Sequence, residues 1–196
     1  MSRKTNRLTA GDVLPLTTVT DMFGAQVSLV PQTGWIHLQF LRFAGCPICN
    51  LHLRQFANKR TRIKDAAVRE VLVFHSSGDE LRTYQADLPF ITIADPDKLL
   101  YAQFGVEKSS RAVINPRVWG SAVRGMVADT RRALQGEAPP PPLRPRHGEL
   151  GLPADFLIGS DGAIRACQYG RHAGDQWSIS ELLSLVGTHE DRITGG

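Results

Sequence analysis

The chain has 196 residues, of which 42% are hydrophobic and 21% charged, and this size and composition favour one globular domain with a real apolar core. No apolar run reaches the roughly 18 residues of a membrane-spanning helix, so we expect no membrane span. The net charge of +4 is too mild to indicate nucleic-acid binding. The basic N-terminal stretch lacks the apolar segment of a secretory signal, so we expect a cytoplasmic protein.

The first predicted elements form a lead-in hairpin. Residues 13–19 and 26–30 have strand character, and turn-forming residues at 21–24 separate them. A Thr-Gly break then precedes residues 35–41, whose aromatic and β-branched content is typical of a buried central strand.

A helix is predicted to begin at Pro47, because proline is favoured at the first helical position, where its missing N–H is not needed. Cys46 is then the N-cap. Residues at three- and four-residue spacing predict one face packed on a sheet, with the stem of an arginine covering its edge. This face comprises Cys49, Leu53, Phe56, Arg60, Ile63 and Ala67. The basic run at 59–64 is interpreted as a solvated surface of the same helix.

The alternation of strands and helices continues along the chain. Residues 71–74 predict a buried strand, 79–86 a short helix and 88–94 the next strand, with a proline at its start. Asp95 is predicted to cap a further helix, which Gly105 ends.

Residues 107–150 break this alternation and are interpreted as an insertion. Apolar residues at helical spacing predict one helix in it, and the prolines at 139–142 end any helix. The apolar stripe of that helix suits the core, a lid or a dimer contact, and the sequence leaves these alternatives open. Its members are Trp119, Val123, Met126, Val127, Thr130 and Leu134.

The last elements are a hairpin and a helix. Two strands, 154–158 and 163–169, flank a Gly-Ser-Asp-Gly turn. A capping box at 178–181 opens the final helix. The predicted order is therefore β-α-β-α-β-α, the insertion, and β-β-α, with no internal repeat.

The stretch Cys46-Pro47-Ile48-Cys49 lies at a strand-to-helix junction. A C-x-x-C motif beside a β-α-β pattern is typical of a thioredoxin-like redox site. The unsatisfied N–H groups and the dipole of the helix start both favour the thiolate form of Cys46. Cys49 can then attack a mixed disulfide or a sulfenic acid on Cys46 and close a disulfide. Arg42, near the end of the preceding strand, either adds positive charge there or points to solvent.

Other interpretations of the cysteines remain open. Both thiols could be small core residues. A zinc site with Cys46, Cys49 and His52 would need a fourth ligand. The remaining cysteine, Cys167, falls on a distant strand and is interpreted as a buried strand residue rather than a redox partner. We expect no metal and no organic cofactor.

Two polar positions could shape a site or be purely structural. His75 follows a strand at its carboxyl end, where the sites of α/β proteins gather. The loop at 172–177 is polar and aromatic and connects the last strand to the last helix.

Three stretches of the sequence, 43–49, 87–96 and 101–106, resemble the peroxiredoxin-like branch of the alkyl hydroperoxide reductase and thiol-specific antioxidant group. This group belongs to the thioredoxin-fold superfamily, and the similarity extends over roughly 10–105 and 150–187.

The resemblance implies an α/β, thioredoxin-like fold, with a central mixed sheet flanked by helices and an N-terminal hairpin. It also implies a single domain over residues 10–190 that carries the insertion, and thiol-based reduction of peroxides or disulfides.

The sequence departs from the family pattern at the motif. Peroxiredoxins carry Pro-x-x-x-Thr-x-x-Cys, and alignment on Cys49 puts Cys46 at the threonine and Arg42 at the proline. The missing threonine favours a disulfide reductase, whereas the 87–106 stretch favours the peroxidase lineage. This alignment would also make Cys49 the attacking thiol. Pro153, just before a strand, matches the cis-proline of thioredoxin-like proteins, beside the dithiol.

Two functions are therefore considered. The first is a thiol-dependent oxidoreductase, with Cys46, Cys49, Arg42 and Pro153 as site residues. Its substrate is a peroxide or a disulfide, and its electron donor is a dithiol protein such as a thioredoxin. A homodimer is one open alternative for its oligomeric state, and we expect it to bind neither nucleic acid nor membrane. The second is a non-enzymatic module of the same fold, in which the basic helix and the 107–150 insertion contact a partner.

Overall fold

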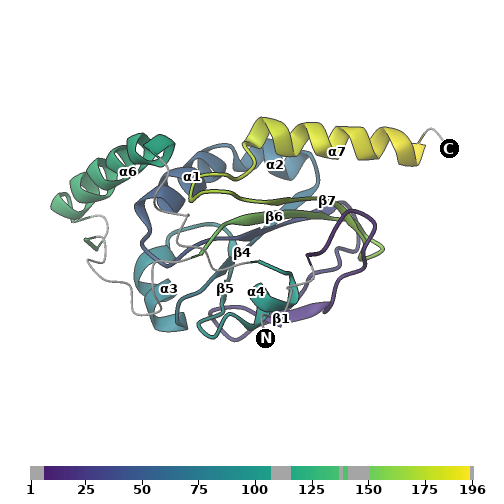
Figure 1. Cartoon of the computed structure of the whole chain (residues 1–196), viewed down its shortest axis with the longest axis horizontal. Coiled ribbons are helices and arrows are strands. Elements are labelled where there is room, and N and C mark those ends of the chain that lie inside the picture. Colours follow the sequence, from purple (N-terminus) through teal and green to yellow (C-terminus); the bar gives the residue numbers. More distant parts are fainter. Residues whose placement is uncertain (1–6, 107–115, 137–138, 141–150, 195–196) are drawn as a thin grey trace.

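The computed structural model describes residues 7–106, 116–136, 139–140 and 151–194 (Figure 1). A mixed five-stranded sheet forms its centre, in the order β5-β4-β3-β6-β7. Strand β3 pairs in parallel with β4 and antiparallel with β6, while β5 extends the parallel side and β7 the antiparallel side. The strands are β3 (Trp35–Phe40), β4 (Val68–Phe74), β5 (Ile91–Ala94), β6 (Ala154–Ile158) and β7 (Ile164–Tyr169). The predicted mixed α/β sheet is confirmed.

Helices cover both faces of this sheet. On one side lie α1, α2 and α7, and on the other lie α4 and the antiparallel hairpin β1-β2 (Figure 1). The helices are α1 (Pro47–Asn58), α2 (Arg60–Asp65), α3 (Gly78–Gln85), α4 (Leu99–Gln103), α6 (Pro116–Leu134) and α7 (Ile179–Thr194), and the hairpin strands are β1 (Thr18–Thr20) and β2 (Gln26–Ser28). Within the described residues, no helix is both long and apolar enough to cross a bilayer.

Every residue of β3 is buried, as its composition predicts for a central strand. Because side chains alternate along a strand, its two faces feed different clusters. Ile36, Leu38 and Phe40 pack with the hairpin and α4. Trp35 packs with α1, α2 and α7 on the opposite face, and Leu41, just after the strand, packs with both cysteines of the motif.

The single predicted helix after the motif is two helices, and the expectation for Arg60 is wrong. The N–H of Lys59 bonds to the carbonyl of Phe56, only three residues back, and Lys59 has φ −112° and ψ 15°. This irregular turn ends α1 and rotates the following residues, so Arg60 is exposed while Ile63 is buried in α2. The rest of the basic run is exposed, as predicted.

Other predicted boundaries also differ. Strand β1 begins at Thr18, and Val13 forms only an isolated bridge to Ala163. Strand β5 begins at Ile91, after the proline that lacks a ladder N–H. The N-cap of α4 is Lys98, although the carboxylate of Asp95 accepts the N–H groups of Leu99 (2.9 Å) and Tyr101 (3.1 Å) as a capping group would. The capping box at the start of α7 is confirmed.

The helix predicted within 107–150 is α6, but its apolar stripe does not form core. The five members whose side chains are described are all exposed: Val123, Met126, Val127, Thr130 and Leu134. The side chain of Trp119 and residues 107–115 and 141–150 lie outside what the structure describes. Helix α6 packs instead beside α1 (Figure 1).

Candidate active site

The loop between β3 and α1 positions Cys46. Gly45 adopts φ 77°, a left-handed conformation that suits glycine and turns the chain into the helix. The N–H of Ala44 donates to Ser76 Oγ (3.0 Å), and the N–H of Cys46 donates to the Phe43 carbonyl (3.2 Å). The predicted N-cap position of Cys46, with a proline next, is confirmed.

The surroundings of Cys46 lower its pKa to about 6. Complete burial alone would raise the pKa, but a hydrogen bond from the Cys49 thiol, the charge of Arg42 and the backbone amides of Cys49 and Ile48 outweigh it. No side-chain hydrogen bond caps α1. The amides at the helix start therefore remain available to stabilise the anionic sulfur. Cys46 is therefore held as a thiolate near neutral pH.

Cys49 has the opposite character. It lies in the first turn of α1, is 1% exposed and packs with Leu53 and Leu72. Its interaction with Cys46 and its burial raise its pKa well above the ordinary value, which the charge of Arg42 offsets only in part. The pair thus consists of one anionic sulfur and one neutral thiol, and both cysteines are unbonded to other sulfurs.

Arg42 points to the dithiol and not to solvent. Its Nη1 lies 3.7 Å from the Cys46 sulfur, and the residue is 5% exposed. Its guanidinium also lies over the Phe43 ring, 5.2 Å from the centroid, and its carbonyl accepts the N–H of His75 (3.2 Å). A buried cation in this position stabilises an anion on sulfur.

Tyr101 is a site residue that sequence reasoning missed. Its single O–H is shared between the carbonyls of Leu41 and Val73, which both lie within hydrogen-bond distance. Burial raises its pKa well above the ordinary value, so it stays a neutral phenol. The hydroxyl links the ends of β3 and β4 behind the cysteines. His75 is buried beside it, with ring centroids 5.8 Å apart.

The cis-proline prediction is wrong. No peptide bond among the described residues is cis, and the bond before Pro153 belongs to this set. Pro153 is buried just before β6, and its carbonyl accepts the N–H of Gly170 (2.8 Å). Its place in the fold is the expected one, because Ala154 pairs with Phe40 near the end of β3. A cis bond is a minority state that needs specific packing, and here a trans bond accommodates this pairing.

A cavity of about 150 Å³ opens beside the motif, at Gly45, the neighbour of Cys46. Helices α1, α3 and α6 enclose it. Its remaining walls are Asn50, Arg54, Thr83, Tyr84, Ala86, Asp87, Asp129, Arg132 and Pro139. This cavity is large enough to hold water, and its walls carry several polar side chains.

The buried carboxylate of Asp129 joins α6 to α1. It accepts hydrogen bonds from Asn50 Nδ2 (3.0 Å) and Arg54 Nη2 (3.1 Å). Gly125, one helical turn earlier, lies against the Pro47 carbonyl: a Cβ at this position would be 2.3 Å from that oxygen. Helix α6 therefore lies directly on the first turn of α1.

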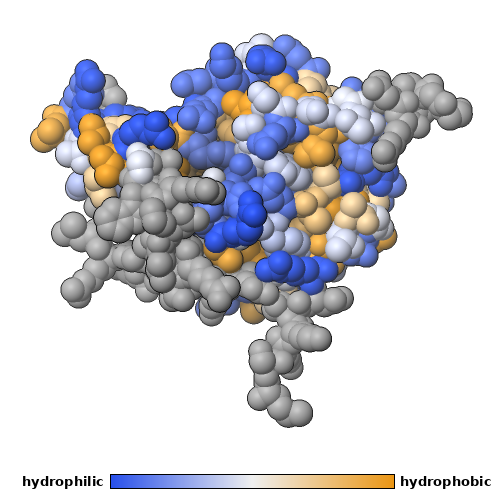
Figure 2. Space-filling view, turned by 45° about the horizontal axis from the view of Figure 1, so that its top comes forward, coloured by the Kyte–Doolittle hydropathy of each residue, from blue (hydrophilic) through white to orange (hydrophobic). Residues whose placement is uncertain are grey.

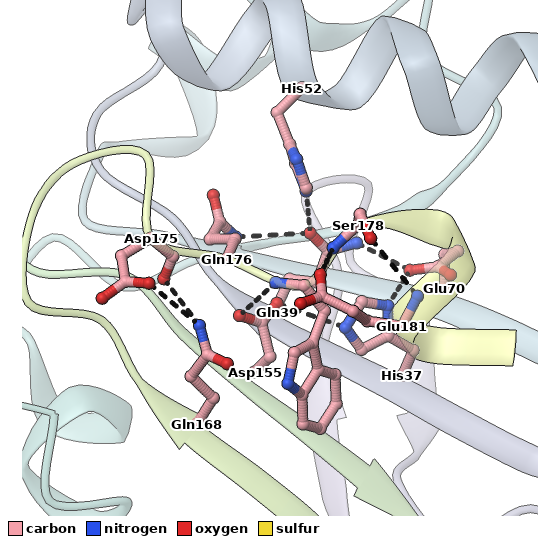
Figure 3. A network of polar contacts seen from close by, with 11 residues as sticks. His37, Gln39, His52, Glu70, Asp155, Gln168, Asp175, Gln176, Ser178 and Glu181 are labelled. Atoms are coloured by element: carbon pink, nitrogen blue, oxygen red, sulfur yellow. Dashed lines mark hydrogen bonds and ion pairs between the residues drawn. The ribbon is translucent and has the colours of Figure 1, made fainter. Parts of the chain in front are cut away.

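A buried polar network joins β3, β4 and β6 (Figure 3). His37 Nδ1 lies 2.8 Å from Glu70 Oε2, and its Nε2 lies 3.2 Å from Asp155 Oδ1. Gln39 donates to Glu70 (2.7 Å), and its carbonyl oxygen lies 3.0 Å from His52 Nε2 on α1. Sequence reasoning missed this network, and its one signal was the presence of polar residues inside otherwise apolar strands.

The remaining sequence-based candidates have separate places in the structure. His52 bonds to the network, and no group of three potential metal ligands comes together within the described residues. Cys167 is half-buried on β7 and donates to the Leu8 carbonyl (3.4 Å). In the 172–177 loop, Trp177 donates its N–H to Asp155 (3.3 Å), and Gly174 lies beside Ile48 of the motif. The loop thus borders the dithiol and anchors α7.

A family model described as the AhpC/TSA family matches residues 10–167. The chain belongs to the AhpC/TSA family. Two relatives from strains of Mycobacterium tuberculosis, each named as a "Putative peroxiredoxin", are 27% identical over 169 residues, which cover 85% of this chain and 88% of the relatives.

Solved structures share the fold. A cysteine-to-serine mutant of peroxiredoxin 6 from Arenicola marina has a TM-score of 0.68 at 15% identity, covering 95% of this chain and 75% of that one. Peroxidoxin BcpB from Mycobacterium tuberculosis has a TM-score of 0.65 at 14% identity, covering 93% and 98%. The predicted thioredoxin-like fold, the peroxiredoxin-like resemblance and the class of thiol-dependent oxidoreductase are confirmed, and the non-enzymatic alternative is not favoured.

Proposed function

We propose that this AhpC/TSA-family protein reduces peroxides, with Cys46 as the attacking thiolate, Cys49 as the resolving thiol and Arg42 as the cation that stabilises the thiolate. The observation that carries the proposal is the place of Cys46. Its sulfur lies at the amino end of α1, 3.7 Å from Arg42 Nη1, next to a thiol that keeps its proton.

The proposed reaction has three steps. The Cys46 thiolate attacks one peroxide oxygen, the O–O bond breaks, and Cys46 becomes a sulfenic acid while an alcohol or water leaves. The Cys49 sulfur attacks Cys46, an S–S bond forms, and the oxygen leaves as water. A dithiol donor such as a thioredoxin then reduces the disulfide by two thiol exchanges and is itself oxidised. We place this cycle in the cytoplasm, where reductants keep thiols reduced.

The family alignment assigns the attacking role to Cys49, and the electrostatics support the reverse. The raised pKa of Cys49 leaves little thiolate for attack, whereas Cys46 is anionic. Pro153 is assigned a supporting role only, as the residue that precedes β6 beside the end of β3.

Disulfide reduction is the second candidate, and one observation favours it. Cys46 occupies the position at which peroxiredoxins carry a threonine, so the motif has the two-thiol form of a disulfide reductase. The same thiolate would attack a disulfide sulfur instead of a peroxide oxygen, and Cys49 would release the mixed disulfide.

Steady-state turnover with dithiothreitol tests the proposal. Hydrogen peroxide and hydroxyethyl disulfide serve as alternative oxidants for the wild type, Cys46→Ser and Cys49→Ser, with Cys167→Ser as the matched control. We expect peroxide turnover to fall about a hundredfold or more in Cys46→Ser and to stay within about twofold in Cys167→Ser. In Cys49→Ser, dimedone should trap one sulfenic acid, located by mass spectrometry on Cys46.

The outcomes separate the candidates. Full peroxide turnover in Cys46→Ser, or a sulfenic acid on Cys49 of that variant, would show that the roles are reversed. Turnover of the disulfide without turnover of the peroxide would assign the protein as a reductase.

A further inference from the structure

Helix α6 is amphipathic, but its described large apolar residues lie on the exposed side and not on the side that contacts the protein. Four large apolar side chains among its described residues face away from the protein, with Val123 60%, Met126 49%, Val127 63% and Leu134 84% exposed. Val123, Val127 and Leu134 recur at intervals of one and two helical turns, and Met126 adjoins Val127. The four residues therefore lie along one side of the helix, as a stripe that we call the α6 stripe. In Figure 2 apolar side chains project at the left of the molecule, among strongly polar ones. Clustered apolar exposure of this kind marks an interaction surface.

The described residues of α6 that face α1 are instead small or polar. Gly125 lies on the Pro47 carbonyl, and Asp129 binds Asn50 and Arg54 of α1. The helix is therefore fixed to the protein by contacts that leave the stripe uncovered.

The rim of the stripe is cationic. Arg124 and Arg131 are exposed on α6, and Asp129, the one acidic residue between 116 and 134, is buried. In an antiparallel pair of two copies centred between Val127 and Ala128, Arg124 of one copy would lie opposite Arg131 of the other. Like charges placed opposite each other oppose such pairing. The surface therefore fits an apolar patch rimmed by carboxylates better than it fits a second copy.

The stripe also lies next to the dithiol. Helix α6 contacts the residue after Cys46, and a helix is about 10 Å across, so a protein bound to the stripe stands one helix diameter from the first turn of α1. Cys46 and Cys49 are 0% and 1% exposed. A protein thiol reaches them only when this turn is uncovered, and α6 is the described helix that lies on it.

We propose that the α6 stripe docks the protein that reduces the Cys46–Cys49 disulfide, a dithiol protein whose reactive site is surrounded by apolar and acidic side chains. The inference rests on the proposed function, which requires a dithiol donor. A thiolate of the partner attacks one sulfur of the disulfide and forms a mixed disulfide. The second thiol of the partner then attacks the partner's sulfur in the mixed disulfide, and the bond between the two proteins breaks. Two electrons and two protons have then passed to the cysteine pair, and the partner leaves as a disulfide.

The test compares a protein donor with a small one. Peroxide turnover of the full chain is measured with an acidic thioredoxin, kept reduced by its reductase and NADPH, and separately with dithiothreitol. We expect Val127→Glu and Arg124→Glu each to raise the KM for thioredoxin about tenfold or more and to leave turnover with dithiothreitol within about twofold. The matched controls are Phe23→Glu, an exposed apolar residue on the hairpin turn, and Arg62→Glu, an exposed cation on α2. Both should leave the two rates unchanged.

Several results would overturn the inference. An unchanged KM for thioredoxin in Val127→Glu would do so, as would thioredoxin failing to support a wild type that turns over with dithiothreitol. A wild-type dimer that Val127→Glu dissociates without changing this KM would assign the stripe to a second copy. Absence of turnover with both donors would instead count against the proposed function.

Discussion

At the scale of single residues, the chemistry depends on which sulfur carries the proton and which carries the negative charge. Cys49 holds the proton, and Cys46 holds the charge beside Arg42. The thiolate of Cys46 is buried, and an ion in a protein interior is costly without compensation. The guanidinium of Arg42 and the Cys49 thiol supply that compensation. Proton and charge are therefore arranged before any substrate arrives.

Replacing Arg42 by methionine tests this division. Removal of the cation should raise the Cys46 pKa from about 6 toward its ordinary value of 9. A smaller fraction of Cys46 would then be thiolate at pH 6.5, so peroxide reduction should slow about five- to tenfold. A tenfold loss of thiolate corresponds to roughly 1.4 kcal/mol. Arg42→Lys keeps a positive charge and should retain most of the rate. Equal rates and equal thiolate titrations in Arg42→Met and the wild type would contradict the role of the cation.

The sequence predicted the site residues that belong to a local pattern. Cys46 and Cys49 follow from their spacing and from Pro47, which places the helix start. The direction of Arg42 stayed open because it lies in the loop after β3, where strand alternation no longer applies. Tyr101 could not be predicted, because its contacts with Leu41 and Val73 join segments far apart in the chain.

At the scale of elements, α6 decides how closely the first turn of α1 is covered. Its approach depends on Gly125, since any larger residue meets the Pro47 carbonyl. Hydrogen bonds from Asn50 and Arg54 to Asp129 then fix it in place.

Gly125→Val should release α6 from α1. A Cβ 2.3 Å from a backbone oxygen cannot be accommodated by a small side-chain shift, and overpacking of this kind typically costs about 1–3 kcal/mol. Hydrogen exchange should therefore become about tenfold faster across residues 116–134 and stay unchanged in β3. Gly120→Val is the matched control, because nothing lies within 4 Å of a Cβ there. Wild-type protection of α6 in Gly125→Val would show that this contact does not hold the helix.

The sequence periodicity predicted which segments are helices or strands better than it predicted which face of each segment is covered. The apolar spacing of α6 predicts a helix but carries no information on which face is covered, and here the covered face is the one with Gly125 and Asp129. The break between α1 and α2 was missed because Lys59 and Arg60 are ordinary helix formers.

At the scale of the whole molecule, the buried network makes stability depend on pH. Burial alone would lower the pKa of His37, but the charges and hydrogen bonds of Glu70 and Asp155 raise it to about 9. A histidine with a raised pKa contributes stability that is complete below its unfolded value of 6.5 and is lost as the pH rises toward 9. Cys46 acts in the opposite sense, because its lowered pKa adds stability as the pH rises from about 6 to 9.

These two groups can be separated by removing the thiols. In Cys46→Ser/Cys49→Ser, the free energy of unfolding from urea titrations should fall by up to about 3 kcal/mol between pH 6.5 and pH 9. In the wild type, Cys46 should offset much of this slope. A double variant whose stability stays level or increases over that range would contradict a protonated His37.

The most direct test of the account is the ionisation of Cys46 itself. Thiolate ultraviolet absorbance can be followed from about pH 4 to pH 10 in Cys167→Ser, where Cys49 keeps its proton over most of this range because its pKa is raised. The account predicts one thiolate forming with a midpoint of about 6, and loss of that transition in Cys46→Ser/Cys167→Ser. A first midpoint near the ordinary value of 9, or a transition that persists without Cys46, would contradict it.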